Sequence, residues 1–321
     1  MITHLDTDPA TGDPPRGALP AEIRRLRDDR RAVILAHYYQ VPDIQEVADF
    51  VGDSLELARE AARTDAEVIV FAGVHFMAET AKILSPGKRV LLPDLQAGCS
   101  LAEGCPAPAF REFRSRHPDH VAVTYINCSA EVKAASDVIC TSSSAETILR
   151  KIPPRTPVLF SPDRNLGRYL VRKTGREMLL WDGSCIVHES FSAGKLEALA
   201  AAHPGARVIA HPECGEAVLG LADFIGSTSA LLAHVQTTRA ATFIVATEPG
   251  ILHQMEKRAP ANRYIPAPPE SSCSCNDCPY MKLNTLEKLY RCMRDMSPEI
   301  TLAPDLLGRA LVPIRRMLEM S

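Results

Sequence analysis

Three short apolar runs in the sequence are each followed by the same series of spacings. The runs end at His37, Tyr125 and His211, which lie 88 and 86 residues apart. A repeat of this length indicates a supersecondary unit that has been duplicated along the chain. The sequence therefore predicts three copies of one folding unit, with these three residues as equivalent anchors.

The residues that follow the anchors also match between the copies. Each copy has an aspartate 12 residues beyond its anchor, a hydroxyl residue 17 residues beyond it, and a cysteine 62, 60 or 67 residues beyond it. In chain order these are Asp49, Asp137 and Asp223; Ser54, Ser142 and Thr228; and Cys99, Cys185 and Cys278. Only the last helix and loop of each copy differ in length.

Within each copy, runs of five to seven apolar or β-branched residues alternate with helical patterns such as 54–59 and 145–150. This alternation is typical of βαβ units and a parallel sheet. We expect an α/β protein of three homologous α-β-α domains, each with a four-stranded parallel sheet, in pseudo-threefold arrangement around a centre. The expected boundaries are 20–100, 101–186 and 187–284, with C-terminal helices over 285–321 that pack on the first domain.

The composition limits the environment and the partners of the chain. Residues 1–19 contain little that is large and apolar, and we expect them to be disordered. A formal net charge of −3 gives no basic field for nucleic acid, and no apolar run approaches the length of a membrane span. Without a signal-peptide pattern, the chain is expected to be cytoplasmic, where its ten cysteines are reduced thiols or metal ligands.

The anchors and the repeated hydroxyl residues all lie where an apolar run gives way to a loop or a helix. Ligands of open parallel sheets bind at the carboxyl ends of the strands, so these side chains are expected around one central cavity. A second set of polar residues follows the anchors at a distance of two: Tyr39, Asn127 and Glu213. The hydroxyl residues have two readings, because a Ser or Thr before a helix can cap it or can help to bind an anion there.

The cysteines also have two readings. Cys273, Cys275 and Cys278 form a local motif that could hold zinc with one further ligand. The repeat instead assigns one cysteine to each copy, which favours Cys99, Cys185 and Cys278 as three ligands of a [4Fe-4S] cluster. Such a cluster leaves one iron open to substrate as a Lewis acid, in the way that a dehydratase uses it.

At this point the motifs resemble those of the quinolinate synthase family. The resemblance runs from about Leu19 to the end of the chain, in separated motifs that occur in order. The motifs are HisTyrTyrGln at His37, GlyAspSer ending at Ser54, AlaGlyCysSer at Cys99, TyrIleAsn at Tyr125, ThrSerSer around Ser142, CysIleValHisGlu from Cys185, HisProGlu from His211, GlySerThrSer around Thr228, and AspCysProTyrMetLysLeuAsnThrLeu from Asp277.

The resemblance implies an iron–sulfur enzyme of de novo NAD biosynthesis that condenses iminoaspartate with dihydroxyacetone phosphate. It implies Cys99, Cys185 and Cys278 as ligands of a [4Fe-4S] cluster. The residues it implies in substrate contact are His37, Ser54, Tyr125, Asn127, Ser142, His211, Glu213 and Thr228. We expect Glu213 to be the principal general base, with His37, Tyr39 and Tyr125 relaying protons.

Two other kinds of protein remain compatible with the sequence. One is an aconitase-like hydro-lyase that acts on another hydroxy acid, and the other is an iron–sulfur or zinc protein that senses redox state. The pathway also implies coupling to an L-aspartate oxidase. The chain departs from many relatives in the spacing of Cys273 and Cys275, which are separated by one residue.

Overall fold

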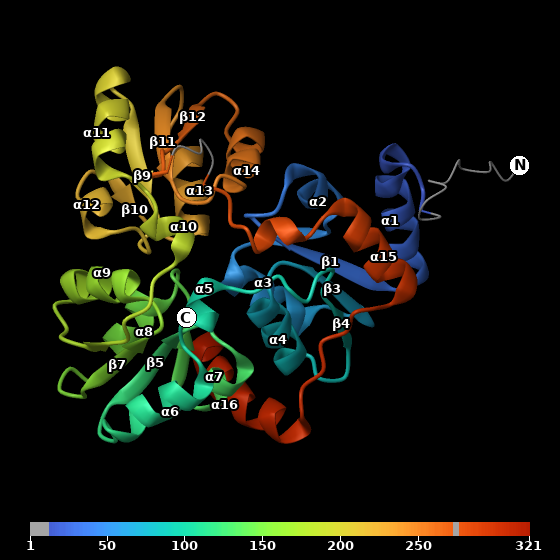
Figure 1. Cartoon of the computed structure of the whole chain (residues 1–321), viewed down its shortest axis with the longest axis horizontal. Coiled ribbons are helices and arrows are strands. Elements are labelled where there is room, and N and C mark those ends of the chain that lie inside the picture. Colours follow the sequence, from blue (N-terminus) through green and yellow to red (C-terminus); the bar gives the residue numbers. More distant parts are fainter. Residues whose placement is uncertain (1–12, 272–275) are drawn as a thin grey trace, which may run out of the picture.

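The computed structural model describes residues 13–271 and 276–321, which form three α/β units around a shared centre (Figure 1). Each unit contains one four-stranded sheet, and the strand orders are β2-β1-β3-β4, β6-β5-β7-β8 and β10-β9-β11-β12. All neighbouring strands within these sheets are parallel. The α/β class and the three homologous units with four-stranded parallel sheets are thus confirmed.

The elements of the three units follow one another in the chain. The first unit contains α1 (Leu19–Asp29), β1 (Ala32–His37), α2 (Pro42–Val47), β2 (Phe50–Gly52), α3 (Ser54–Arg63), β3 (Val68–Ala72), α4 (His75–Leu84) and β4 (Arg89–Leu91). The second contains α5 (Ser100–Glu103), α6 (Ala107–Ser115), β5 (Val121–Tyr125), α7 (Ala130–Ala134), β6 (Val138–Cys140), α8 (Ala145–Lys151), β7 (Val158–Ser161), α9 (Arg164–Thr174) and β8 (Leu179–Leu180). The third contains α10 (Ile186–Glu189), α11 (Ala193–Ala202), β9 (Arg207–Ala210), α12 (Glu216–Leu219), β10 (Phe224–Ile225), α13 (Thr228–Thr237), β11 (Thr242–Ala246), α14 (Ile251–Arg258) and β12 (Arg263–Pro266).

The aspartate that recurs in each unit holds the first strand of its sheet. In the first unit, the Asp49 carboxylate accepts the backbone N–H of Ile34 at 2.8 Å, and the Asp49 N–H donates to the Ile34 carbonyl at 3.0 Å. The same pair of bonds joins Asp137 to Ala122 and Asp223 to Val208. The repeated aspartate is therefore a structural residue. It stands directly before the second strand of its unit and pairs with a backbone N–H and a backbone carbonyl of the first strand.

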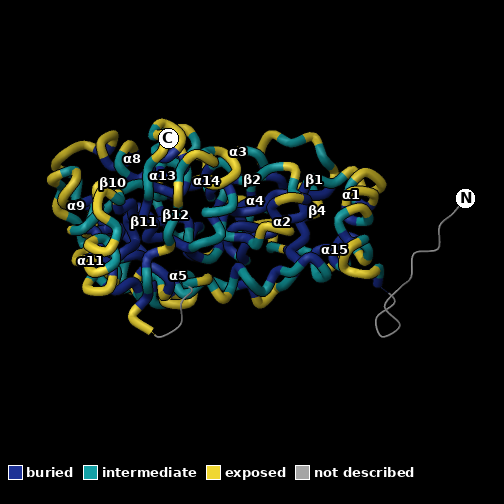
Figure 2. The backbone as a smooth tube through the Cα atoms, turned by 90° about the horizontal axis from the view of Figure 1, so that it is seen from above, coloured by how far each residue is buried: buried dark blue, intermediate teal, exposed yellow. Residues whose placement is uncertain are grey.

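The first and second units share one apolar core, whereas the third unit has separate cores. One large cluster of buried residues runs through the first and second units and includes Phe71 and Phe160, whereas the third unit packs around clusters that contain Ile244 and Phe243. Buried segments occupy the middle of the molecule, and most exposed segments lie at its rim (Figure 2). The first strand of each unit ends in this buried region, at His37, Tyr125 and Ala210.

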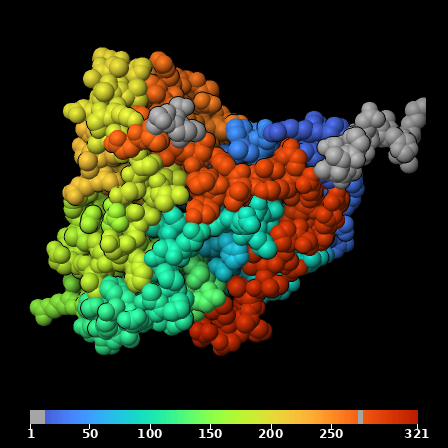
Figure 3. Space-filling view, viewed as in Figure 1, coloured from blue at the N-terminus to red at the C-terminus, as the bar shows by residue number. Residues whose placement is uncertain are grey.

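The C-terminal helices differ in part from the expectation that both pack on the first unit. Helix α15 (Leu286–Asp295) does pack against α1, through Leu286 and Leu289 among others. Helix α16 (Pro304–Met320) lies mainly on α7 and β6 of the second unit and also contacts α4 (Figure 1). The orange and red C-terminal segment thus crosses the face shown in Figure 3 and links the units.

The N-terminal segment also differs from its expectation. Residues 1–12 of the expected disordered segment lie outside the described residues. Residues 13–19 are folded: the Asp13 carboxylate accepts hydrogen bonds from Arg291 at 2.5 Å and from Arg294 at 2.7 Å, and Arg16–Ala18 forms a turn of 3-10 helix. Within residues 13–271 and 276–321, no helix combines the length and the apolar character that a membrane crossing requires.

Candidate active site

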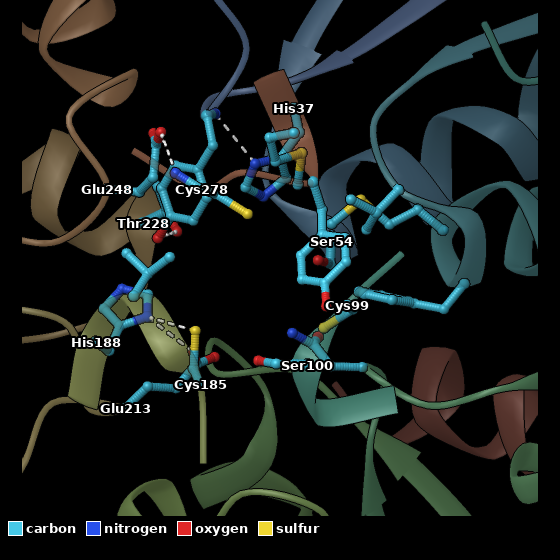
Figure 4. A pocket seen from close by; sticks show the side chains of 18 of the residues that line it. His37, Ser54, Cys99, Ser100, Cys185, His188, Glu213, Thr228, Glu248 and Cys278 are labelled. Carbon is cyan, nitrogen blue, oxygen red and sulfur yellow. Dashed lines mark hydrogen bonds and ion pairs between the residues drawn. The ribbon is translucent and has the colours of Figure 1, made fainter. Parts of the chain in front are cut away.

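A cavity lies where the three units meet (Figure 4). The structure brings all twelve residues that the sequence singles out for a site to the wall of this one cavity. They are His37, Tyr39, Ser54, Cys99, Tyr125, Asn127, Ser142, Cys185, His211, Glu213, Thr228 and Cys278. Residues up to 241 positions apart in the chain thus meet because each follows, or ends, a strand at the carboxyl edge of its sheet.

The two anchor histidines are held in the same way. The Tyr39 N–H donates to His37 Nδ1 at 3.1 Å, and the Glu213 N–H donates to His211 Nδ1 at 3.4 Å. Because Nδ1 accepts a hydrogen bond in each ring, the ring proton of the neutral form lies on Nε2. Burial lowers the pKa of both imidazoles to about 3, so both are neutral at physiological pH.

Glu213 lies at the centre of a hydrogen-bonded group that joins the second and third units. The Tyr125 hydroxyl donates to Glu213 Oε1, and His188 Nδ1 lies 3.0 Å from Glu213 Oε2. Burial alone would raise the pKa of Glu213, but the imidazoles of His188 and His211 and the Tyr125 hydroxyl hold it below its usual value. The Glu213 side chain is therefore a carboxylate at neutral pH.

The same group continues to the first unit through two hydroxyl residues. His188 Nε2 lies 2.9 Å from Thr247 Oγ1, and the Tyr39 hydroxyl lies 2.7 Å from the same oxygen. Thr228 Oγ1 lies 3.4 Å from the Tyr39 hydroxyl on the cavity side. A continuous chain of polar contacts thus runs from Tyr125 to Thr228. Burial raises the pKa of Tyr39 well above its ordinary value, so the phenol keeps its proton.

The repeated hydroxyl residues do not cap their helices. Asp53 caps α3 by accepting the N–H groups of Leu55 and Glu56, and Ser227 caps α13 by accepting that of Ala230. Ser54 and Thr228 are the first residues of these helices, and their side chains line the cavity. The capping reading is therefore wrong for these two residues, and their hydroxyls remain available to a ligand.

The three helix starts also differ in charge. The N-terminus of α3 already holds the Asp53 carboxylate, which is 4% exposed, and the Glu56 carboxylate, which accepts the Asp53 N–H at 2.8 Å. Two carboxylates there offset the positive end of the helix dipole. The expectation of three equivalent anion-binding helix starts is thus unsupported for the first unit. In the second unit, α8 starts only at Ala145, and Ser142 lies in the preceding turn.

The cysteines divide into two groups by exposure. Cys99, Cys185 and Cys278 are partly exposed and face the cavity, and each comes from the loop that follows the last strands of one repeat (Figure 4). The other five described cysteines are buried in the cores: Cys105, Cys128, Cys140, Cys214 and Cys292. Cys273 and Cys275 lie outside the described residues, and with them the local zinc motif.

The surroundings of the three cavity thiols suit thiols that bind a metal group better than thiols that stay free. Burial raises the pKa of Cys99 to about 12, and the nearby Cys278 sulfur raises it further. Cys99 likewise raises the pKa of Cys185, so the thiols lie close enough to affect one another. Sulfur atoms held together in this way become thiolates only when a cation compensates their charge, which a bound metal does.

Several residues that line the cavity have no place in the sequence-based prediction, among them Asp53, His188 and Glu248. His188 lies inside the CysIleValHisGlu motif, and its Nδ1 is 3.3 Å from Cys185 Sγ. The ligand atoms of Cys185, His188 and Glu213 lie within 4.8 Å of one another, a group that could hold a metal ion. In the sequence, Glu248 directly follows the third apolar run of the last repeat, and this position could have marked it as a site residue.

The fold and the cavity define a class of protein: a three-unit α/β enzyme whose buried site combines three thiols with neutral imidazoles and the ionised Glu213 carboxylate. Comparison with known protein families identifies the family within this class. Residues 21–319 match the model of the quinolinate synthetase A protein family, and the chain belongs to this family.

Curated relatives in cyanobacteria agree over almost the whole chain. The quinolinate synthase of Thermosynechococcus vestitus is 64% identical over 304 residues, which cover 94% of this chain and 95% of that protein. That of Nostoc sp. strain PCC 7120 is 62% identical over 309 residues, with 95% of each chain covered. That of Synechocystis sp. strain PCC 6803 is 59% identical over 312 residues, covering 96% and 98%.

Proposed function

We propose that this chain is a quinolinate synthase, which condenses iminoaspartate with dihydroxyacetone phosphate to give quinolinate, phosphate and water. The observation that carries the proposal is that Cys99, Cys185 and Cys278, one from each repeat, line the same cavity as the repeated polar residues. Identity of about 60% with curated quinolinate synthases over almost the whole chain supports it. Both substrates are small molecules that would enter this cavity.

In this proposal, Cys99, Cys185 and Cys278 hold a [4Fe-4S] cluster. Three thiolate ligands leave one iron free to act as a Lewis acid on a hydroxyl or carboxylate of the substrate. The placement of all three thiols on the wall of one cavity supports this assignment. The cluster type and its ligands belong to the proposal.

The cavity wall offers directed hydrogen bonds to an anionic substrate. His211 Nε2 lies 3.2 Å from Ser142 Oγ, and since this nitrogen carries the ring proton, the serine oxygen accepts. The Ser142 hydroxyl hydrogen is then free to bind a carboxylate or phosphate oxygen. Asn127 Oδ1 is buried without a hydrogen-bond partner among the described residues, which leaves it for a donor group such as an imine or a hydroxyl.

The proton transfers are assigned to the group around Glu213. Its carboxylate is ionised and accepts from Tyr125, so it can take a proton from a bound substrate and share it along the contacts to His188. A pKa below the usual value makes a weak base, but the carboxylates and phosphate of bound substrates raise it by like-charge repulsion. His37, with its proton on Nε2, acts as a hydrogen-bond donor, and Tyr39 continues the relay through Thr247.

The test of the proposal is an anaerobic assay. Protein reconstituted with iron and sulfide is supplied with iminoaspartate and dihydroxyacetone phosphate, and quinolinate is measured by its absorbance and mass. Formation of quinolinate with release of one phosphate per turnover supports the proposal. An iron-loaded protein that makes no quinolinate but dehydrates another hydroxy acid would instead identify an aconitase-like hydro-lyase.

A further inference from the structure

The loops that carry the three cysteines are not fastened to their sheets in the same way. In the first unit, the N–H of His75, just after β3, donates to the carbonyl of Ala97 at 2.7 Å. In the second, the N–H of Arg164, just after β7, donates to the carbonyl of Gly183 at 2.8 Å. Ala97 and Gly183 each lie two residues before the cysteine of their unit, so a backbone bond fixes both loops.

The third unit uses a side chain in place of this backbone bond. The N–H of Gly250, which lies 39 residues beyond its anchor as Arg164 does, donates to Glu248 Oε2 at 2.7 Å. Glu248 Oε1 accepts the N–H of Cys278 itself at 3.2 Å (Figure 4). The loop from the third strand to the cysteine is longer here than in the other units. The Glu248 carboxylate therefore bridges the backbone after the third strand and the backbone of the cysteine loop, which are joined by a direct hydrogen bond in the other units.

Among the described residues, the Glu248 carboxylate has a single cationic partner, and that partner connects it to the first unit. Lys282 Nζ lies 2.6 Å from Glu248 Oε1 and donates to the Tyr39 carbonyl at 2.7 Å. Glu248 has no exposed surface, whereas the Lys282 side chain is 22% exposed. A buried carboxylate without its cation is strongly unfavourable, so Lys282 is what allows Glu248 to remain charged beside the cavity.

We propose that Glu248, with Lys282 as its counter-charge, is the positioning residue that holds Cys278 in place for the cluster. Its three partners among the described residues are all hydrogen-bond donors: the N–H groups of Cys278 and Gly250 and the ammonium group of Lys282. Both side-chain oxygens of residue 248 must therefore act as acceptors. Glutamine has the same shape, but its amide NH2 would face one of these donors. The inference rests on the proposed function, since it presumes that Cys278 is a cluster ligand.

The experiment compares iron binding in matched variants after anaerobic reconstitution. Iron and sulfide contents are measured first, and then the rate of iron release to a colorimetric chelator. We expect Glu248→Gln and Lys282→Met to release iron about 10- to 100-fold faster than the unmodified protein, the usual effect of losing an outer-shell partner of a metal ligand. Lys282→Arg, which keeps the charge, is expected to release iron at close to the normal rate.

A second buried acid provides the matched control. Glu79 is also buried, accepts the backbone N–H of Ala130 at 2.9 Å and lies near the buried Lys133, and among the described residues no hydrogen bond joins its carboxylate to Cys99, Cys185 or Cys278. Glu79→Gln is expected to lower the thermal unfolding temperature of the apoprotein while iron release stays normal. If Glu248→Gln fails to fold, the rates of iron release from Lys282→Met and Lys282→Arg are compared instead.

The outcomes separate this inference from the proposed function. Normal iron release from both Glu248→Gln and Lys282→Met, in a protein whose unmodified form holds iron, overturns the inference and leaves the function standing. Equal acceleration by Glu79→Gln also overturns it, because the effect would then follow from lost stability alone. If the unmodified protein holds no iron, the proposed function fails, and the inference fails with it.

Discussion

The Tyr125 hydroxyl, at the end of the first strand of the second unit, donates a hydrogen bond to the Glu213 carboxylate of the third unit. These residues lie 88 positions apart and occupy neighbouring places in successive repeats. Tyr125 is an anchor, and Glu213 stands two residues beyond the next anchor. The contact shows how the repeat builds its site: equivalent strand ends from different units face one another across one cavity.

The first prediction concerns this carboxylate. We expect Glu213→Gln to lower the turnover number by on the order of 10²-fold or more, the usual contribution of a general base. Glutamine cannot take a proton, and its amide cannot accept from Tyr125 and His188 at once. Iron content is measured beside turnover in the same preparation. Full turnover in a variant with normal iron content would remove Glu213 from the proton transfers.

The second prediction concerns the pH dependence of folding stability. The pKa of His37 is about 3 in the folded protein and about 6.5 when unfolded, so below pH 6.5 the unfolded chain binds more protons. The free energy of unfolding therefore falls as the pH is lowered from about 6.5 towards 3.

His37→Asn tests this directly, because the asparagine oxygen can accept the Tyr39 N–H in place of Nδ1. We expect the variant to reduce the slope of unfolding free energy against pH by about 1.4 kcal/mol per pH unit between pH 6 and 4. Urea denaturation of the apoprotein at several pH values measures it. An unchanged slope would mean that His37 does not stay neutral in the folded chain.

The third prediction concerns the repeated aspartates. Asp223→Ala removes the acceptor of the Val208 N–H, which lies at 2.7 Å, and leaves that strand group without its partner. We expect the free energy of unfolding to fall by about 1–3 kcal/mol, while the Michaelis constants stay near their normal values. Denaturation and steady-state kinetics give the two numbers. A selective loss of substrate affinity would instead assign Asp223 to the site.

The fourth prediction concerns the contact between the first and third units. A methyl group on Gly250 would lie 2.8 Å from Glu248 Oε2 and 2.8 Å from backbone atoms of Tyr39, which cannot give way easily. Gly250→Ala is expected to cost about 1–3 kcal/mol of stability.

Gly194, inside α11, provides the control because no atom of the described residues lies within 4 Å of its added methyl group. We expect Gly194→Ala to stabilise the protein by about 0.5–1 kcal/mol, through the higher helix propensity of alanine. Thermal unfolding of both variants checks the pair. If Gly250→Ala proves as harmless as Gly194→Ala, the two units do not approach as closely as the structure has them.

Much of the fold and the site follows from the sequence because parallel sheets place chemically related residues at one edge. A match in spacing between His37, Tyr125 and His211 is enough to predict that the strand ends converge. The separation of Cys99, Cys185 and Cys278 from the buried cysteines follows from the same spacing. All of these residues line the one cavity.

Two of the residues that sequence reasoning missed, His188 and Glu248, have no counterparts in the repeat. His188 stands three residues beyond Cys185, where the other units have Ala102 and Met281. Glu248 makes up for a loop that is longer in one unit only, so periodicity gives it no support. The capping residues Asp53 and Ser227 were overlooked because the spacing pointed to the residues after them.

The placement of the chain ends could not be read from the sequence for a related reason. An apolar stripe on α16 predicts that the helix is buried, but it does not tell which unit covers it. The structure places it against α7 and β6 of the second unit. Asp13 likewise lies in a proline-rich stretch, and its tertiary pairing with Arg291 and Arg294 could not be predicted from that stretch.

The most direct test of the central claim is the iron and sulfide content of the anaerobically reconstituted protein and of single Cys→Ser variants. A single [4Fe-4S] cluster held by the three cavity thiols would give about four irons and four sulfides per chain. The account predicts that Cys99→Ser, Cys185→Ser and Cys278→Ser each lose most of this content, whereas Cys292→Ser keeps it. A protein that binds zinc in place of iron, or one that keeps its cluster after loss of any of the three cavity thiols, would contradict the account.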